Sequence, residues 1–514
     1  MKTVYILASL ILSSTFLYAQ PSVKSDTIKP NKGNVDKQLE KIKDRKENLH
    51  DTTGNEPAKS KTVDKKIENK YGDLLDDDKE YNKKYPVWKP ATQVLGILFF
   101  TWSIDRFLLN ADYAHIGIKT WKYNINKGWE WDADRFGINF LGHPYSGALT
   151  YNAARSSGYN YFQSSLFSIG GSLMWEYFGE NTRPSYNDII NTPINGAFLG
   201  EMLYRLSSNI LDDRTSGADR FFRELAAGLI DPMRGINRLF QGKSFRITNK
   251  EVYEKEPLNV SLYAGMHRIN DETNKGFGNT KNSGIINFQF DYGNPFETRS
   301  RKPFDFFKIR ADLNFGVGRK IVDNVIGYGI LFGKNMNIGN MSMLIGGFQY
   351  YDYFDNMSFE LGTIGFGGGL FSKLPFSDKT NLYTNIHWAI VPFAGNSTRL
   401  GPDTSQVRDY IFGTGWEGKF ESTLNLGKYV SASLIYYYYM VTTRVGAPGN
   451  NYIQMLKPRI TVHIYKDLNI GFEHFIYYDD RYLRDLAAIH SVRTEQKIFL
   501  LLYLEDSQRR GKYN

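Results

Sequence analysis

Between residues 258 and 504, apolar and polar side chains alternate with a period of two. In the clearest segment, 306–318, hydrocarbon side chains alternate with Lys308, Arg310 and Asp312. A period of two is that of a β-strand, whose successive side chains point to opposite faces. A hydrocarbon face opposite an ionic face is typical of a strand between lipid and a polar lumen. The pattern therefore predicts an antiparallel transmembrane β-barrel.

The pattern divides into about twelve strands, although ten or fourteen also fit the middle of the chain. Long strands favour a barrel over a soluble sandwich, which shows the same period. Beyond residue 394, long and short connections alternate, as extracellular loops and periplasmic turns do. Aromatic clusters such as 350–354 and 436–439 are interpreted as girdles at the membrane interfaces. The predicted strands are 258–269, 283–293, 305–318, 324–334, 342–353, 358–371, 380–394, 410–424, 428–442, 452–464, 468–479 and 490–504.

Residues 86–245 have a different pattern, because their apolar positions recur at the spacing of α-helices. Glycines at 158, 179 and 242 are natural helix ends. We therefore predict an all-α domain of about six helical segments before the barrel. These segments are 88–109, 134–141, 146–155, 161–178, 185–211 and 217–240.

The N-terminus indicates export. A basic Lys2, a short apolar stretch and the sequence Leu17-Tyr18-Ala19 predict a signal peptide over residues 1–19. Residues 20–85 are charged and poor in apolar side chains, which predicts a disordered linker, and 506–514 form a polar tail. The chain has no cysteine, so a lipoprotein anchor, disulfides and thiolate metal sites are excluded.

Composition supports a location in the outer membrane. Aromatic residues make up 15% of the chain, yet the mean hydropathy is −0.42, as expected where apolar and polar residues alternate. The net charge is +9, but the lysines cluster in the N-terminal tail and exported chains rarely meet nucleic acid, so we do not expect nucleic acid as a partner. Expected partners are outer-membrane lipid and, beyond it, envelope glycan or a periplasmic protein. The helical domain is expected on the periplasmic side or within the barrel.

Ionisable residues gather within the apolar helical region. His143, Arg155 and Glu176 are candidate catalytic residues: His143 or Glu176 as general acid or base, and Arg155 as the ligand of an anionic head group. The alternative is a hydrogen-bonded network that locks helix packing. Neither a cofactor nor a metal is predicted. The residues assigned to the structural network are Tyr151, Asp188, Asn191 and Glu201.

The order of these residues resembles a known pattern. His143-Pro144, Gly147, Tyr151 and Arg155, followed by Trp175-Glu176 and by 184–201, resemble an uncharacterised family of exported proteins. In that family a helical domain of unknown function precedes a predicted outer-membrane barrel. The later half is also similar to VanZ-like membrane proteins, although this chain lacks clear spanning helices. The resemblance covers roughly residues 86–245 and implies no established activity.

The predicted lumen carries charges of both signs, whereas a selective pore usually shows a bias. Mixed charges indicate internal ion pairs or contact with a plug. We therefore expect the helical domain to cap or plug the periplasmic mouth, with a role in envelope maintenance or lipid and glycan contact. An enzyme that modifies envelope lipid and a gated channel for a small solute are the alternatives. The charged residues assigned to the lumen are Lys308, Arg310, Asp312, Arg459 and Glu495.

Overall fold

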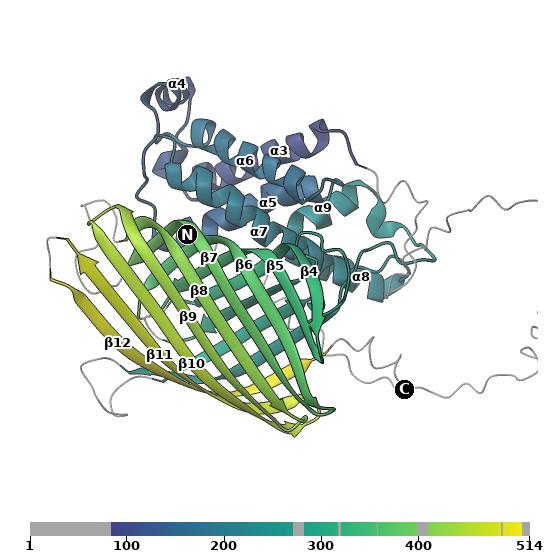
Figure 1. The fold of residues 1–514 in the computed structure, drawn as a ribbon. Helices are drawn as coiled ribbons and strands as arrows, with labels where there is room; N and C mark the ends of the chain where they lie inside the picture. Colours follow the sequence, from purple (N-terminus) through teal and green to yellow (C-terminus); the bar gives the residue numbers. More distant parts are fainter. Residues whose placement is uncertain are drawn as a thin grey trace, which may run out of the picture.

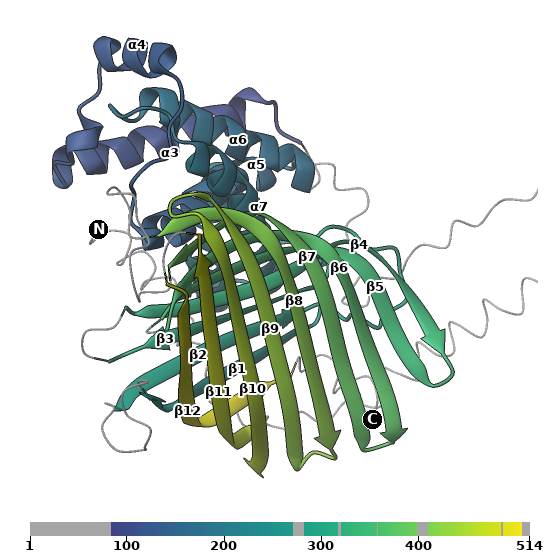
Figure 2. The same cartoon turned by 60° about the vertical axis from the view of Figure 1, so that its left-hand side comes forward.

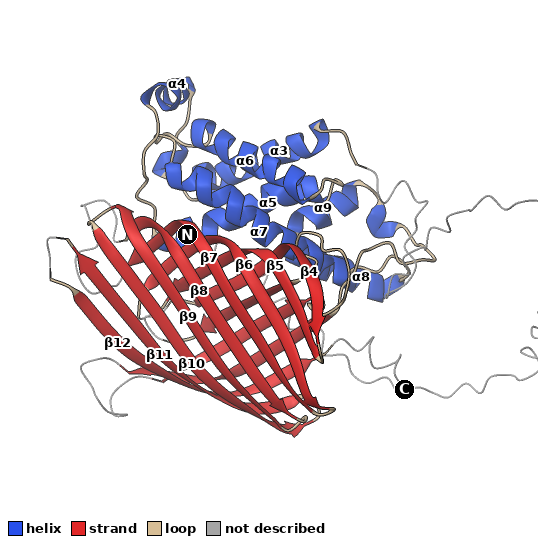
Figure 3. Ribbon diagram, in the orientation of Figure 1, coloured by secondary structure: helices blue, strands red, loops and turns tan. Residues whose placement is uncertain are grey.

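A computed structural model describes residues 84–270, 282–316, 320–356, 358–397, 410–484 and 487–505. The predicted signal peptide, the tail 506–514 and all but the last two residues of the predicted linker lie outside these ranges. The chain forms a helical domain followed by a closed antiparallel β-barrel of twelve strands (Figures 1 and 3). The predicted fold class is therefore confirmed.

Each of the twelve barrel strands pairs with its neighbours in the chain, and the last strand pairs with the first. Every predicted strand overlaps one observed strand. The strands are β1 (Leu258–Asn270), β2 (Asn282–Tyr292), β3 (Phe307–Asn314), β4 (Val322–Ile338), β5 (Met341–Asp355), β6 (Glu360–Ser377), β7 (Thr380–Ser397), β8 (Ile411–Leu426), β9 (Val430–Val445), β10 (Gly449–Tyr465), β11 (Leu468–Leu483) and β12 (Ile489–Leu504).

The described part of the helical domain contains seven α-helices, against six predicted helical segments. The predicted segment 134–141 is not an α-helix of its own, because Asp134 lies in irregular chain and residues 138–141 belong to the short π-helical turn η5 (Ile138–Gly142). The predicted helix over 217–240 is two helices, because Pro232 cannot continue the hydrogen-bond ladder and the Asp231 side chain caps the second helix. Helix α4 was not predicted. The α-helices are α3 (Trp88–Ser103), α4 (Ile118–Lys127), α5 (His143–Arg155), α6 (Tyr161–Phe178), α7 (Tyr186–Ile210), α8 (Gly217–Ile230) and α9 (Pro232–Phe240).

Short π-helical turns extend two elements: η3 (Ile104–Leu108) follows α3, and η5 (Ile138–Gly142) leads into α5. Single 3₁₀ turns lie at Asp112–Ala114 and Lys243–Phe245. Among the described residues, no helix combines the length and apolar character needed to cross a bilayer.

The lumen of the barrel is filled by side chains that meet from opposite walls. Lys308 on β3 pairs with Glu421 on β8 at 3.0 Å, and Lys419 on β8 pairs with Asp352 on β5 at 2.6 Å. The ring of Phe354 on β5 packs against that of Tyr439 on β9. These strands are not neighbours in the sheet, so their side chains meet only across the interior.

One connection folds into the barrel at the end where the turns are short. Segment 293–306 joins β2 to β3, and its Phe296 ring lies 6.0 Å from the ring of Tyr383 on β7. Arg301 donates to Asn335 on β4 at 3.0 Å, while Phe306 packs against Phe371 on β6. This segment therefore narrows that mouth of the barrel from within.

The helical domain packs against the outer wall of the barrel, as β5 demonstrates. Tyr350 and Asp352 point into the lumen, whereas their neighbours Gln349 and Tyr351 point to the opposite face. Gln349 Nε2 donates to the carbonyl of Ile194 on α7 at 2.9 Å, and the Tyr351 hydroxyl donates to the carbonyl of Phe140 at 2.6 Å. Residues of opposite parity on one strand face opposite sides, so the helices lie outside.

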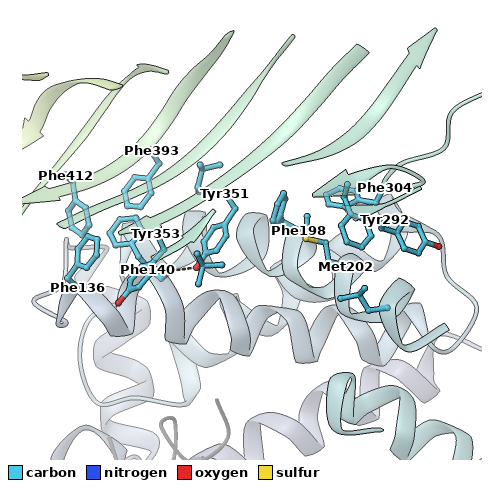
Figure 4. Packing of buried hydrophobic residues seen from close by; sticks show 14 of the residues in the cluster. Phe136, Phe140, Phe198, Met202, Tyr292, Phe304, Tyr351, Tyr353, Phe393 and Phe412 are labelled. Carbon is cyan, nitrogen blue, oxygen red and sulfur yellow. Dashed lines mark hydrogen bonds between the residues drawn. The ribbon is translucent and has the colours of Figure 1, made fainter. Parts of the chain in front are cut away.

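A continuous aromatic cluster forms this contact (Figure 4). Phe140 stacks on Phe393 of β7 at 5.7 Å, and its ring lies where Gly362 and Gly395 leave room for it. Phe198 of α7 packs against Phe304 at 5.4 Å, near the start of β3. Figures 1 and 2 show the helices lying along one side of the sheet, with α7 nearest to the strands.

Two predictions are corrected by this arrangement. The helical domain neither plugs nor caps the mouth, because the lumen charges pair with one another and the helices contact outward-facing residues. The aromatic cluster 350–354 is not an interfacial girdle: its members alternate between the lumen and the helical interface. Periodicity identifies an apolar outer face but does not distinguish lipid from a helix as the group that covers it.

Candidate functional site

His143, the first residue of α5, lies among carboxylates supplied by two other segments. Its Nε2 is 3.3 Å from Asp134 Oδ2 and 3.5 Å from Asp188 Oδ1. Asp188 lies in the first turn of α7, and Asp132 and Asp134 precede η5. The first turns of two helices thus face one chain segment, and we call Asp132, Asp134, His143, Glu176 and Asp188 the histidine site.

Hydrogen bonds from neighbouring polar residues hold the carboxylates of this site. The Ser185 backbone N–H donates to Glu176 Oε2 at 2.6 Å, and the Ser185 hydroxyl donates to Asp132 Oδ2 at 3.2 Å. Asn139 donates to the second oxygen of Asp132 at 3.2 Å, and Asn187 donates to Asp188 at 2.9 Å. The carboxylates are therefore fixed in orientation rather than free to turn away from one another.

Charge in the site is unbalanced towards the negative. Burial acts to lower the pKa of His143, but the nearby charges of Asp188, Asp134 and Asp132 outweigh it and raise that pKa well above its ordinary value. Burial and repulsion from Asp132 and Glu176 raise the pKa of Asp188, against the attraction of His143. Burial also raises the pKa of Glu176, with repulsion from Glu180. The site therefore retains protons that isolated carboxyl groups would release.

The site combines a buried interior with access from solvent. The Asp188 side chain is 6% exposed and that of His143 is 16% exposed, whereas that of Asp134 is 46% exposed. One donor atom each from Asp132, His143 and Asp188 lies within 4.8 Å of the others. A small polar group could reach His143 past Asp134, and the imidazole could then exchange a proton with it.

Arg155 belongs to a second cluster at the other end of α5. Its Nε donates to Glu201 Oε2 at 2.7 Å, Arg205 Nε donates to Oε1 at 2.8 Å, and the Tyr151 hydroxyl donates to Oε2 at 2.6 Å. Burial acts to raise the pKa of Glu201, but the charges of Arg155 and Arg205 lower it to about 2. Both oxygens of this fully buried carboxylate are satisfied, as in a structural network.

The three candidate catalytic residues thus do not form one centre. His143 and Arg155 are twelve positions apart on one helix, which separates them by about 18 Å along its axis. Glu176 accepts a hydrogen bond from Ser185 and is close enough to His143 for the charge of the imidazole to act on its pKa, so Glu176 belongs with His143. Arg155 instead pairs with Glu201. Of the residues assigned to the structural network, Tyr151 and Glu201 share one cluster and Asp188 belongs to the histidine site.

Asn191 and the motif glycines have packing roles. Asn191 donates to the Asn139 carbonyl and accepts from Asn195 at 2.7 Å, which ties η5 to α7. A Cβ on Gly147 would lie 1.9 Å from the Thr192 carbonyl oxygen, and one on Gly196 would lie 2.6 Å from the Gly147 backbone. Helices α5 and α7 therefore cross in direct backbone contact, which explains these glycines without any ligand.

The sequence interpretation missed Asp132, Asp134 and Asn187. Asp132 and Asp134 lie in a segment without regular structure, where no periodic spacing connects them to His143. Asn187 carried a usable signal, because it follows the predicted start of a helix and precedes Asp188. Only the folded chain brings the carboxylates of the irregular segment to the two helix starts.

The residues assigned to the lumen pair with other lumen residues. Lys308 pairs with Glu421, Asp312 with Lys497 at 2.9 Å, and Arg459 with Glu473 at 3.2 Å. Glu495 lies 2.5 Å from His267 Nδ1, and Arg310 is buried on the same face of β3 as Lys308 and Asp312. Lys308, Asp312 and Arg459 thus form ion pairs within the lumen, as does Glu495 with Lys497 at 3.6 Å.

Comparison with known proteins finds a family model that matches part of the helical domain and solved structures that are similar to the barrel. A family model described as "Domain of unknown function (DUF3943)" matches residues 128–233, the region that holds both polar clusters. The resemblance to VanZ-like proteins is not among the matches, and no curated protein matches the chain.

Solved structures similar to the barrel are outer-membrane channels. The outer-membrane channel DcaP of Acinetobacter baumannii is 7% identical, with 48% of this chain and 96% of that chain covered and a TM-score of 0.23. The NanC porin is 7% identical, with 48% and 100% covered and a TM-score of 0.28. The toluene transporter TodX of Pseudomonas putida is 8% identical, with 50% and 90% covered and a TM-score of 0.21. At these values they carry no argument about function.

Proposed function

We propose that this chain is an outer-membrane protein whose closed barrel anchors the helical domain beside it, and that the histidine site acts on an envelope lipid by acid–base chemistry. The observation that carries the proposal is the attachment of the helical domain to the outer wall of the barrel. In a membrane, that wall borders lipid. A site held there has lipid as its nearest abundant substrate.

The surface of the helical domain suits this position. Large apolar side chains on several helices are more than half exposed, which is unusual for a soluble domain of this size. The barrel wall that the helices leave uncovered is apolar as well, with Trp388, Ile390 and Ile460 exposed. Contact with acyl chains would cover both surfaces. The exposed residues of the helical domain include Phe99, Phe100, Phe162, Leu166, Phe221, Phe222, Leu239 and Phe240.

The filled lumen argues against the channel alternative. Ion pairs and aromatic contacts join opposite walls at several levels, and segment 293–306 narrows one mouth. A pathway for solute would require these contacts to separate together. We therefore assign the barrel the role of a membrane anchor.

The chemistry of the site fits proton transfer at a polar head group. His143 lies between the partly exposed Asp134 and the buried Asp188. Hydrogen-bonded carboxylates hold the imidazole ring in place and stabilise its charged form. The imidazole can therefore donate a proton to a leaving oxygen or, once deprotonated, accept one from water.

A role in envelope maintenance without catalysis is the second candidate. The satisfied Glu201 network and the backbone contact of α5 with α7 favour it, because both stabilise the domain without an open site. In this case the helical domain would bind lipid, glycan or a periplasmic protein through its surface. The short-turn end of the barrel would face the periplasm in either case.

The test is the lipid profile of cells that carry single substitutions. We expect cells that carry His143→Ala or Asp188→Asn to accumulate or lose one lipid species, while the abundance of the variant protein stays normal. His490→Ala is the matched control, because it removes an exposed barrel histidine that also pairs with a carboxylate, Asp480 at 2.9 Å. Glu201→Gln tests the structural cluster and is expected to lower abundance instead. Unchanged lipids in both site variants at normal abundance would reject catalysis.

A further inference from the structure

Asp132, His143 and Asp188 place three metal-binding groups around one point. They come from the segment before η5, the start of α5 and the first turn of α7, and one donor atom of each lies within 4.8 Å of the other two. Imidazole and carboxylate groups bind a divalent transition metal at about 2.0 to 2.2 Å. Small side-chain rotations would therefore bring all three donors to one ion.

The histidine ring is oriented as a ligand would be. Its Nε2 lies within hydrogen-bond distance of Asp134 Oδ2, at 3.3 Å, and 3.5 Å from Asp188 Oδ1. The only ion pairs of Asp134 and Asp188 within the described ranges are those with this imidazole. Two carboxylates compete for one ring, and a divalent cation would compensate both charges.

The surroundings supply the outer contacts that metal ligands generally require. Asn187 donates to Asp188, and Asn139 and Ser185 donate to the two oxygens of Asp132. Such partners fix the direction of a ligating carboxylate. Asp134 is 46% exposed at the open side, so an ion has access from solvent and a coordination position can remain open there.

We propose that Asp132, His143 and Asp188 bind one divalent transition-metal ion, of the Mn²⁺, Fe²⁺ or Zn²⁺ type that accepts one imidazole and two carboxylates. Asp134 lies at the open position, where it can ligate the ion or take a proton from a bound water. The inference rests on the proposed lipid chemistry but moves the proton transfer from the imidazole, which would ligate the ion, to a water held by the ion, since such an ion would polarise a phosphoryl or carbonyl oxygen and activate water. Metal binding is nevertheless measurable without any lipid substrate.

The experiment uses the full chain, purified in detergent micelles and treated with a chelator. Zn²⁺ and Mn²⁺ are titrated separately by equilibrium dialysis with elemental analysis, and the melting temperature is followed in parallel. We expect one ion per chain, a higher melting temperature with metal, and at least a 100-fold weaker affinity in Asp132→Asn and Asp188→Asn. Asp219→Asn, an exposed carboxylate on α8 paired with Arg223, is the control and should bind normally.

Two results would overturn the inference. One is no bound ion in the natural chain with either metal. The other is equal affinity in the natural chain and in both asparagine variants, with circular dichroism showing that these variants are folded.

The metal proposal and the lipid proposal can fail separately. Site-dependent metal binding with an unchanged lipid profile would reject the lipid chemistry alone, and a changed lipid profile without bound metal would reject the ion alone.

Discussion

Asp231 shows how burial can outweigh nearby favourable groups and set the charge of a residue in the helical domain. Its side chain accepts from the Arg234 N–H at 3.1 Å and caps α9, yet it is completely buried. Burial raises its pKa from 3.8 to about 6, against the opposing effect of the Arg234 N–H and guanidinium. Because the folded state binds this proton more tightly than the unfolded chain, the contribution to stability is largest at low pH. It decreases as pH rises from about 4 to about 6.

We predict that Asp231→Asn removes this pH dependence while keeping the capping oxygen. Relative to the variant, the natural protein should lose about 2 kcal/mol of unfolding free energy between pH 4 and pH 7. Guanidinium unfolding in micelles, followed by the helical circular dichroism signal, measures the difference. Parallel stability curves for the two proteins across this range would contradict the assignment.

At the residue scale, helix geometry decides how much of the site can be predicted. His143, Glu176 and Asp188 are recognisable as buried ionisable residues among apolar neighbours. The grouping of Arg155 with His143 in one centre was wrong. Twelve helical positions rotate Arg155 by about 120° from His143 and also separate the two residues along the helix axis. Asp132 could not be predicted, since it reaches the site through an irregular segment.

At the scale of elements, the crossing of α5 and α7 gives a sharp prediction. Gly196→Ala would place a methyl group 2.6 Å from the backbone of Gly147, which cannot move without its helix. We expect a loss of about 1 to 3 kcal/mol or more, as for other overpacked contacts. Thermal unfolding of the helical signal is the measurement.

Gly170→Ala provides the matched control on α6. A Cβ there meets nothing within 4 Å, so the substitution should be neutral or stabilising by about 1 kcal/mol, the helix propensity difference. Equal effects of the two substitutions would show that propensity, rather than the close approach of the helices, explains the glycine at 196.

Strands were easier to predict than helices for a physical reason. Alternation of apolar and polar side chains marks the strands, so each of the twelve is found, with bounds that differ from the observed ones by at most six residues. The bulge between Val391 and Ala394 on β7 shifts the facing, and its sequence signal is Pro392, which cannot donate to the strand ladder. Helix α4 was missed although Ile118, Trp121 and Ile125 recur at helical spacing, because ten residues give too short a pattern. The break between α8 and α9 does carry a sequence signal, because Asp231-Pro232 is a capping residue followed by a proline that cannot continue a helix.

At the scale of the whole molecule, the filled lumen predicts a barrel that does not conduct. In planar bilayers the full chain should show no steps of the size given by an open porin measured beside it. The physical reason is the set of side chains that meet across the interior, Lys308 with Glu421 and Lys419 with Asp352 among them. Regular porin-sized steps would show that the lumen opens and would restore the channel hypothesis.

The position of the helical domain is the feature that sequence could least predict, and it is also the easiest to test. The chain has no cysteine, so a pair introduced by substitution is the only reactive pair. Gln349 donates to the carbonyl of Ile194, whereas its neighbour Tyr350 points into the lumen and bonds His387 at 2.9 Å. We predict that Ile194→Cys with Gln349→Cys is joined by a short bifunctional thiol reagent, and that Ile194→Cys with Tyr350→Cys is not.

The outcome is read as a shift in electrophoretic mobility after complete unfolding, because a crosslink between residues 194 and 349 closes a long loop that keeps the denatured chain compact. Positions 349 and 350 are neighbours on β5 but point to opposite sides of the barrel wall. Efficient crosslinking of the 194–349 pair, with little crosslinking of the 194–350 pair, would therefore require the helices to lie on the outward face of β5. The reverse preference would place α7 inside the barrel. The histidine site would then be withdrawn from lipid, and the proposed substrate would have to enter through the lumen.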